Sequence, residues 1–171
     1  MDFSPVKRVL SNPDLEGLYS IVLSQRIYGD IMRFADQYNF RVFNLDNINI
    51  LDFKQMVRTF AKQLGYNDVY HRHANLDGFL DYMGIEFEQT KGLDSNGIII
   101  IFFGIQQLFE LFNMDMGTIL DTFGLLTPSS LQTHLPLYVF FALEENQVIN
   151  DRLQALLDKY EVKDIGKSDE V

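Results

Sequence analysis

The sequence contains no cysteine among its 171 residues. The absence of thiols excludes a disulfide framework, a thiolate zinc site, a cysteine nucleophile and a redox pair. A chain without disulfides fits a reducing compartment, so we expect a cytoplasmic protein. Stability then has to come from the core, for which the 47% of apolar residues, 15 Phe and 8 Tyr among them, are sufficient.

Long apolar runs are also missing. The two longest cover residues 98–103 and 137–143, whereas a membrane-spanning helix needs about 18–20 such residues. The first residues, Met1-Asp2-Phe3-Ser4-Pro5, include an acid and no hydrophobic signal segment. We therefore expect a protein that neither crosses a membrane nor carries a secretion signal.

Basic residues are scarce relative to acidic ones. The chain has 14 Lys and Arg against 24 Asp and Glu, a net charge of -10. This field repels a phosphate backbone and an anionic bilayer surface, so binding to nucleic acid or to a membrane is not expected. The same field attracts a basic macromolecular partner, although acidity can also serve solubility alone.

Signatures of catalysis are absent as well. No Gly-rich phosphate loop follows an apolar run, and no G-x-S-x-G elbow occurs. We expect no enzymatic activity, no cofactor and no metal. One alternative stays open, in which His71 and His73 bind a metal together with Asp68 or Asp77 and form a metal-dependent hydrolase.

Three short apolar segments are typical of strands. Residues 40–45 alternate in polarity, residues 97–103 are almost wholly apolar, and residues 137–143 follow a proline. A strand that need not alternate is covered on both faces, as in a parallel sheet. Segments with helical spacing separate the three strands. The pattern predicts an α/β fold, a three-stranded parallel sheet flanked by helices.

The rest of the chain is expected to be helical. Asn12-Pro13-Asp14 resembles a helix start, and helical spacing continues to residue 39, which makes residues 1–39 an N-terminal helical extension. Residues 40–143 form the α/β core. Residues 144–171 form a C-terminal helix on or near the core, and we expect its charged tail from residue 163 to fray.

Two aspartates share one face of a short helix between the first two expected strands. Asn75 caps this helix, and Asp77 and Asp81 are four residues apart, so both carboxylates project from the same side. They are either a solvated pair or a negative patch that meets cationic groups of a partner. The loop before the helix holds Tyr70, His71 and His73, which are residue types enriched in interfaces.

The stretch Asn75-Leu76-Asp77-Gly78-Phe79-Leu80-Asp81, followed by an aliphatic strand, helices and a last strand, resembles the barstar family. Members of that family are small acidic inhibitors of ribonuclease toxins. The resemblance covers roughly residues 40–143. It implies a three-stranded parallel sheet and a helix that, with its preceding loop, plugs a nuclease active site. It also implies that Asp77 and Asp81 are the interface aspartates.

The sequence departs from the family pattern in several places. Gly78 and Phe79 replace Ala and Leu, and the family's acidic contact from a later helix has no clear match, although Asp121 is nearby. Leu80 stands where a Trp is common. His71-Arg72-His73 stands where the family has an aromatic pair and a glycine, which changes the backbone options of the loop. These departures imply a target other than the usual small secreted ribonuclease.

The resemblance and the charge lead to one expected function. The chain is expected to be an immunity protein that blocks a cognate bacterial toxin nuclease, as a monomer in a 1:1 complex, in contact-dependent competition between bacteria. The alternative is an acidic interaction domain without a toxin. The residues expected to bind the partner are Asp68, Tyr70, His71, His73, Asn75, Asp77, Leu80 and Asp81.

Overall fold

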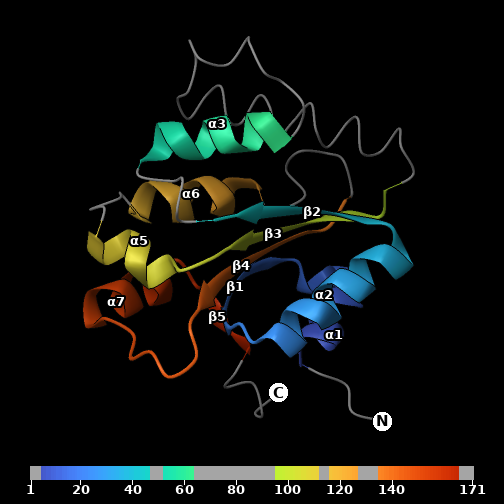
Figure 1. The fold of residues 1–171 in the computed structure, drawn as a ribbon, viewed down its shortest axis with the longest axis horizontal. Helices are drawn as coiled ribbons and strands as arrows, with labels where there is room; N and C mark the ends of the chain where they lie inside the picture. Colours follow the sequence, from blue (N-terminus) through green and yellow to red (C-terminus); the bar gives the residue numbers. More distant parts are fainter. Residues whose placement is uncertain (1–4, 47–51, 64–94, 112–115, 127–134, 166–171) are drawn as a thin grey trace.

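The computed structural model describes residues 5–46, 52–63, 95–111, 116–126 and 135–165 (Figure 1). Five parallel strands form one sheet in the order β2-β3-β4-β1-β5. The strands are β1 (Gly17–Val22), β2 (Phe40–Leu45), β3 (Gly97–Phe102), β4 (Leu137–Leu143) and β5 (Lys163–Asp164). The described helices are α1 (Pro5–Leu10), the 3-10 turn η1 (Pro13–Leu15), α2 (Gln25–Tyr38), α3 (Phe53–Gln63), α5 (Ile105–Leu111), α6 (Met116–Leu126) and α7 (Asp151–Lys159).

The expected α/β architecture and parallel sheet are confirmed. The three strands read from the sequence coincide with β2, β3 and β4, which lie side by side. Every residue of β3 and β4 is buried, as expected for strands covered by helices on both faces. The expected core strands were therefore placed correctly.

The sheet has five strands rather than three, and β1 lies inside the stretch expected to be helical. Asn12 does cap, since its Oδ1 accepts a hydrogen bond from the Asp14 amide at 3.0 Å, but the helix is the single turn η1. Gly17, at φ 147°, carries the chain from this turn into β1. The apolar spacing here fits a helix and a buried strand alike, and pairing of β1 along β4 selects the strand.

The C-terminal prediction also needs two corrections. Helix α7 begins at Asp151, after Asn150, whose Oδ1 accepts from the Arg152 amide at 2.9 Å, and not at residues 144–145. The start of the expected fraying tail forms β5, which pairs with β1. Ile165, directly after β5, is buried against α1 and α2. Non-local pairing thus orders residues that look like a solvated tail.

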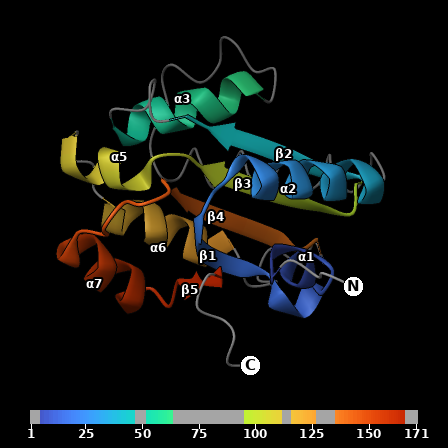
Figure 2. The ribbon, with the colours of Figure 1, turned by 60° about the horizontal axis from the view of Figure 1, so that its bottom comes forward.

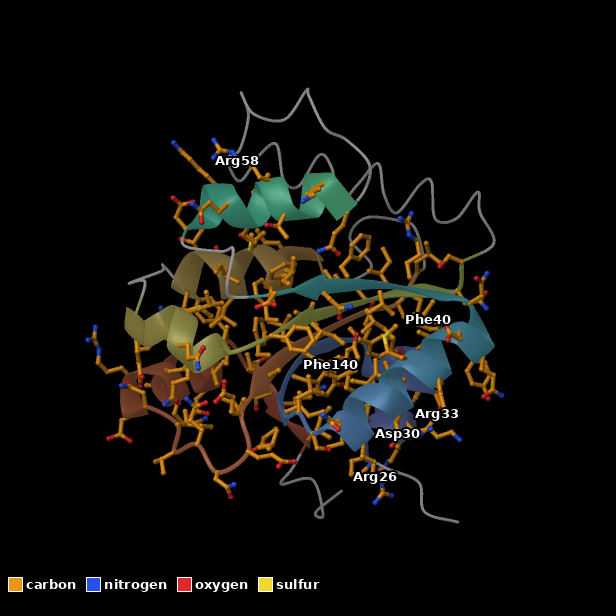
Figure 3. The ribbon with its side chains drawn as sticks, in the orientation of Figure 1. Arg26, Asp30, Arg33, Phe40, Arg58 and Phe140 are labelled. Carbon is orange, nitrogen blue, oxygen red and sulfur yellow. The ribbon has the colours of Figure 1, made fainter. Side chains whose placement is uncertain are left out.

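Helices cover both faces of the sheet (Figure 1, Figure 2). Helices α1 and α2 pack on one face, and α3, α5, α6 and α7 pack on the other. Figure 3 shows Phe40 and Phe140 pointing into the layer beneath α2, while Arg26, Asp30 and Arg33 lie along the outer side of that helix. Within the described residues, no helix is both long and apolar enough to span a bilayer.

Candidate functional site

All eight residues expected to bind a partner lie outside the described residues, in the segment 64–94. The structure fixes the two points where this segment joins the fold. Gln63 ends α3 and donates from Nε2 to the Asn44 carbonyl oxygen at 2.7 Å, near the carboxyl end of β2. Ser95 donates from Oγ to the Asn39 carbonyl oxygen at 3.1 Å, at the amino end of β2. The segment therefore begins and ends beside the edge strand of the sheet.

Charge is distributed unevenly between the described residues and the rest. The described ranges carry 14 acidic against 11 basic residues, and the remaining residues carry 10 against 3. The segment 64–94 alone has six acidic residues and two basic ones. The described residues thus carry a net charge of -3, and most of the net negative charge belongs to the remaining residues.

The metal alternative is not tested by the structure. His71 and His73 both lie in the segment 64–94, outside the described residues. The part of the chain that the structure describes holds no group of three or more His, Asp or Glu side chains that could bind a metal ion. The expectation of a protein without a metal stays a prediction.

A pocket that the sequence did not indicate lies at the carboxyl ends of β1, β3 and β4. After β1 the chain enters α2 on one face of the sheet, whereas after β3 and β4 it continues to helices on the other face. Parallel sheets commonly bind ligands where the chain departs to opposite faces. The pocket encloses about 300 Å³, and its lining includes Leu23, Ser24, Tyr28, Phe103, Gln107 and Glu144. We call it the carboxyl-edge pocket.

One wall of the carboxyl-edge pocket is aromatic. The rings of Tyr28 and Phe103 meet edge to face, with centroids 5.8 Å apart. Asn44 Nδ2 and Tyr28 Oη are hydrogen-bonded at 3.2 Å, which ties α2 to the end of β2. Two main-chain hydrogen bonds extend the strand pairing at this edge. The Leu23 amide donates to the Leu143 carbonyl oxygen at 3.1 Å, and the Phe103 amide donates to the Leu45 carbonyl oxygen at 2.9 Å.

The rim of the pocket is polar. Gln107, in the first turn of α5, donates from Nε2 to Glu144 Oε1 at 3.1 Å. Its neighbour Gln106 is buried and holds the chain before α7, donating to the Val148 carbonyl oxygen at 2.9 Å and accepting from the Asn150 amide at 3.1 Å. On the opposite side, Ser24 Oγ caps α2 by accepting from the Ile27 amide at 3.2 Å. The rim is therefore held by elements from both faces of the sheet.

A second hollow of about 490 Å³ lies on the other side of the α2 N-terminus. Its lining includes Val6, Ile21, Arg26, Asp30, Glu145 and Ile165. Charges of both signs lie on its rim, and Asp30 pairs with Arg33 one turn further along α2. Mixed charge gives this hollow no preference for a ligand of one sign.

Titratable groups gather at the amino ends of β1 and β4. The Tyr138 hydroxyl donates to the Asn12 carbonyl oxygen at 2.9 Å, and burial, aided by Tyr19 and Glu16 nearby, raises the pKa of Tyr138 above its usual value. Glu16 Oε2 accepts from the Leu137 amide at 3.3 Å. Burial raises the pKa of Glu16, and this hydrogen bond opposes the rise. These contacts join η1 to β4 and have a structural role.

The sequence carried only a weak signal for the carboxyl-edge pocket. Its polar residues follow directly after three apolar strands, but one of those strands, β1, was expected to be helical. No family model matches the chain, and no curated protein or solved structure matches it either.

Proposed function

We propose that the chain is an immunity protein that inhibits a bacterial toxin nuclease, a ribonuclease in the first instance. One observation carries the proposal: strands β2, β3 and β4 are parallel neighbours, with α3 and the acidic segment 64–94 between the first two. The barstar resemblance implies this order of elements for residues 40–143. The motif Asn75-Leu76-Asp77-Gly78-Phe79-Leu80-Asp81 falls at the corresponding point of the chain.

The inhibitory chemistry is phosphate mimicry. A nuclease binds the phosphates of its substrate with Arg, Lys and His side chains. Carboxylates such as those of Asp77 and Asp81 can accept charge-assisted hydrogen bonds from the same groups. The inhibitor then occupies the active site without presenting a bond that the enzyme can cleave.

The placement of charge supports the same function. The segment 64–94, with six acidic residues against two basic ones, supplies a concentrated negative field, and the described layers are close to neutral. A concentrated negative field accelerates the encounter with a basic enzyme, and salt screens it. The association rate with the toxin should therefore fall as ionic strength rises.

The strands outside the expected core change the role of the terminal regions. Strand β1 lies directly beside β4, and β5 lies beside β1. The terminal regions thus build the sheet, and the proposed interface rests on the segment 64–94. We propose a monomer in a 1:1 complex with the toxin.

The proposal is tested with the product of the neighbouring gene and with proteins captured by the purified chain in its native organism. The expected result is a captured nuclease whose activity falls to zero at one equivalent of the chain. Capture of partners without nuclease activity would instead support an acidic interaction domain and overturn the proposed function.

A further inference from the structure

The carboxyl-edge pocket combines an aromatic wall with a single charged residue on its rim. We propose that this pocket binds the guanidinium group of an arginine side chain of the partner protein. The proposal rests on the proposed function for the nature of the partner, a basic protein, and it adds a second contact point outside the segment 64–94.

The size of the pocket suits one side chain. Its volume of about 300 Å³ lies at the lower end of the range of roughly 300–1,000 Å³ in which proteins bind small ligands. A single extended side chain reaches into such a space, whereas a dinucleotide does not. The chain also lacks the Gly-rich turn that holds a pyrophosphate at this edge of a parallel sheet.

The walls suit a long apolar stem with a flat polar end. Leu23, Ala142 and Phe103 give apolar contact, and the methylene groups of an arginine pack on such surfaces. The Tyr28 and Phe103 rings are fixed by their edge-to-face contact and by the hydrogen bond between Tyr28 and Asn44. Planar, weakly hydrated guanidinium groups pack against aromatic rings better than ammonium groups do.

The charge of the pocket selects a cation. Glu144 is the one charged residue among those that line it, and its side chain is exposed. Oε1 of Glu144 accepts the hydrogen bond from Gln107, which orients the carboxylate. Among the described residues no ion pair to Glu144 neutralises it. A phosphate or carboxylate ligand would be repelled there, and a guanidinium can form charge-assisted hydrogen bonds with the carboxylate.

Two variants separate the effect of the Glu144 charge from the effect of the shape of the pocket. Glu144→Gln keeps an oxygen that can accept the hydrogen bond from Gln107 and removes only the charge. Glu145→Gln is the matched control, because Glu145 is the next residue, is exposed and lines the other hollow instead. Both variants change the net charge by the same amount, so a difference in their affinity for the arginine ligand arises at the carboxyl-edge pocket and not from net charge.

The test is a titration of the full chain with Nα-acetyl-L-arginine amide, followed by heteronuclear NMR at low salt. We expect saturable shifts at the pocket residues for the wild type and for Glu145→Gln. We expect binding about fivefold or more weaker for Glu144→Gln, and equally weaker for the neutral citrulline analogue with the wild type. Absence of saturable binding by the wild type, equal binding by Glu144→Gln, or equal binding of the citrulline analogue would each overturn the proposal.

The titration needs no toxin, so its failure is distinguishable from failure of the proposed function. A chain that inhibits a nuclease but binds no arginine amide would overturn only the pocket proposal. A chain that binds arginine amide through Glu144 but captures no nuclease would overturn only the proposed function.

Discussion

Gly97 lies against Phe40 so closely that a Cβ atom on Gly97 would come within 2.9 Å of the Phe40 Cδ1 atom. The same atom would lie 2.9 Å from the Pro136 carbonyl oxygen. Gly97 and Phe40 are register partners at the amino ends of β3 and β2. This contact stands where the segment 64–94 rejoins the fold, next to the hydrogen bond from Ser95 to the Asn39 carbonyl oxygen.

We predict that Gly97→Ala destabilises the protein by about 1–3 kcal/mol, because the added methyl group forces the Phe40 ring or the backbone to move. The control is Gly29→Ala within α2, where the added Cβ has no atom within 4 Å besides those of its chain neighbours and of its own helix backbone. The control should instead stabilise by roughly 0.5–1 kcal/mol, since alanine favours the helix. Urea unfolding measures both, and equal stability of the two variants would contradict the packing described.

Neighbouring residues of β1 test the strand that the sequence did not indicate. Ile21 is 2% exposed and Val22 is 46% exposed. Ile21→Ala should cost about 2–5 kcal/mol, because it opens a cavity under α1 and α2, and Val22→Ala should cost less than about 1 kcal/mol. Thermal or denaturant unfolding gives both values. Similar costs at the two positions would argue against β1 as a buried strand.

The buried amide of Gln106 should stabilise the packing of α7 on the rest of the fold. Gln106→Leu leaves the Val148 carbonyl oxygen and the Asn150 amide without this partner, at about 1–3 kcal/mol for each group that water does not reach. Gln154 is the control, since within the described part of the chain its side chain bonds to Asp158 alone, at an exposed site of α7. Gln154→Leu should change stability by less than about 0.5 kcal/mol. A stability of Gln106→Leu equal to that of the control would refute this role.

Stability should depend on pH through Glu16. Burial raises the folded-state pKa of this carboxyl, so the native state binds the proton more tightly than the unfolded state does. This contribution to stability is present at pH below the unfolded value and is lost as pH rises through the folded-state pKa. Glu16→Gln should therefore gain stability relative to the wild type as pH rises from about pH 4, the ordinary range of a glutamate carboxyl. A difference that stays constant over this range would contradict the raised pKa.

Much of the sheet could be predicted from local sequence pattern. The two strands that were missed, β1 and β5, were missed for the same reason. Strands β3 and β4 are apolar throughout, so their burial on both faces was visible in the sequence. Strand β1 and the two residues of β5 gain their structure from pairing with distant partners, β4 and β1 respectively. Such pairing leaves little trace in a local window, which is why a helix and a fraying tail were expected there.

The carboxyl-edge pocket was not predicted, because part of it depends on the position of β1, which was expected to be helical. Its walls join Tyr28 of α2, Phe103 after β3 and Glu144 after β4. Pairing of β3 with β4 brings Phe103 and Glu144 together, and Tyr28 joins them because β1, which pairs with β4, leads into α2. The expected partner-binding residues of the segment 64–94 came from the residue types of the loop, from the spacing of the two aspartates and from the family resemblance, and they lie outside the described residues. They stay a prediction.

The most direct test of the central claim compares two double variants in binding to the captured toxin nuclease. One is Asp77→Ala with Asp81→Ala. The other is Asp36→Ala with Glu145→Ala, which removes the same charge from exposed positions on α2 and after β4. Loss of a buried charge contact costs roughly 2–5 kcal/mol, so we predict a dissociation constant about 30-fold or more weaker for the first variant alone. Wild-type affinity of that variant would contradict phosphate mimicry by these two aspartates.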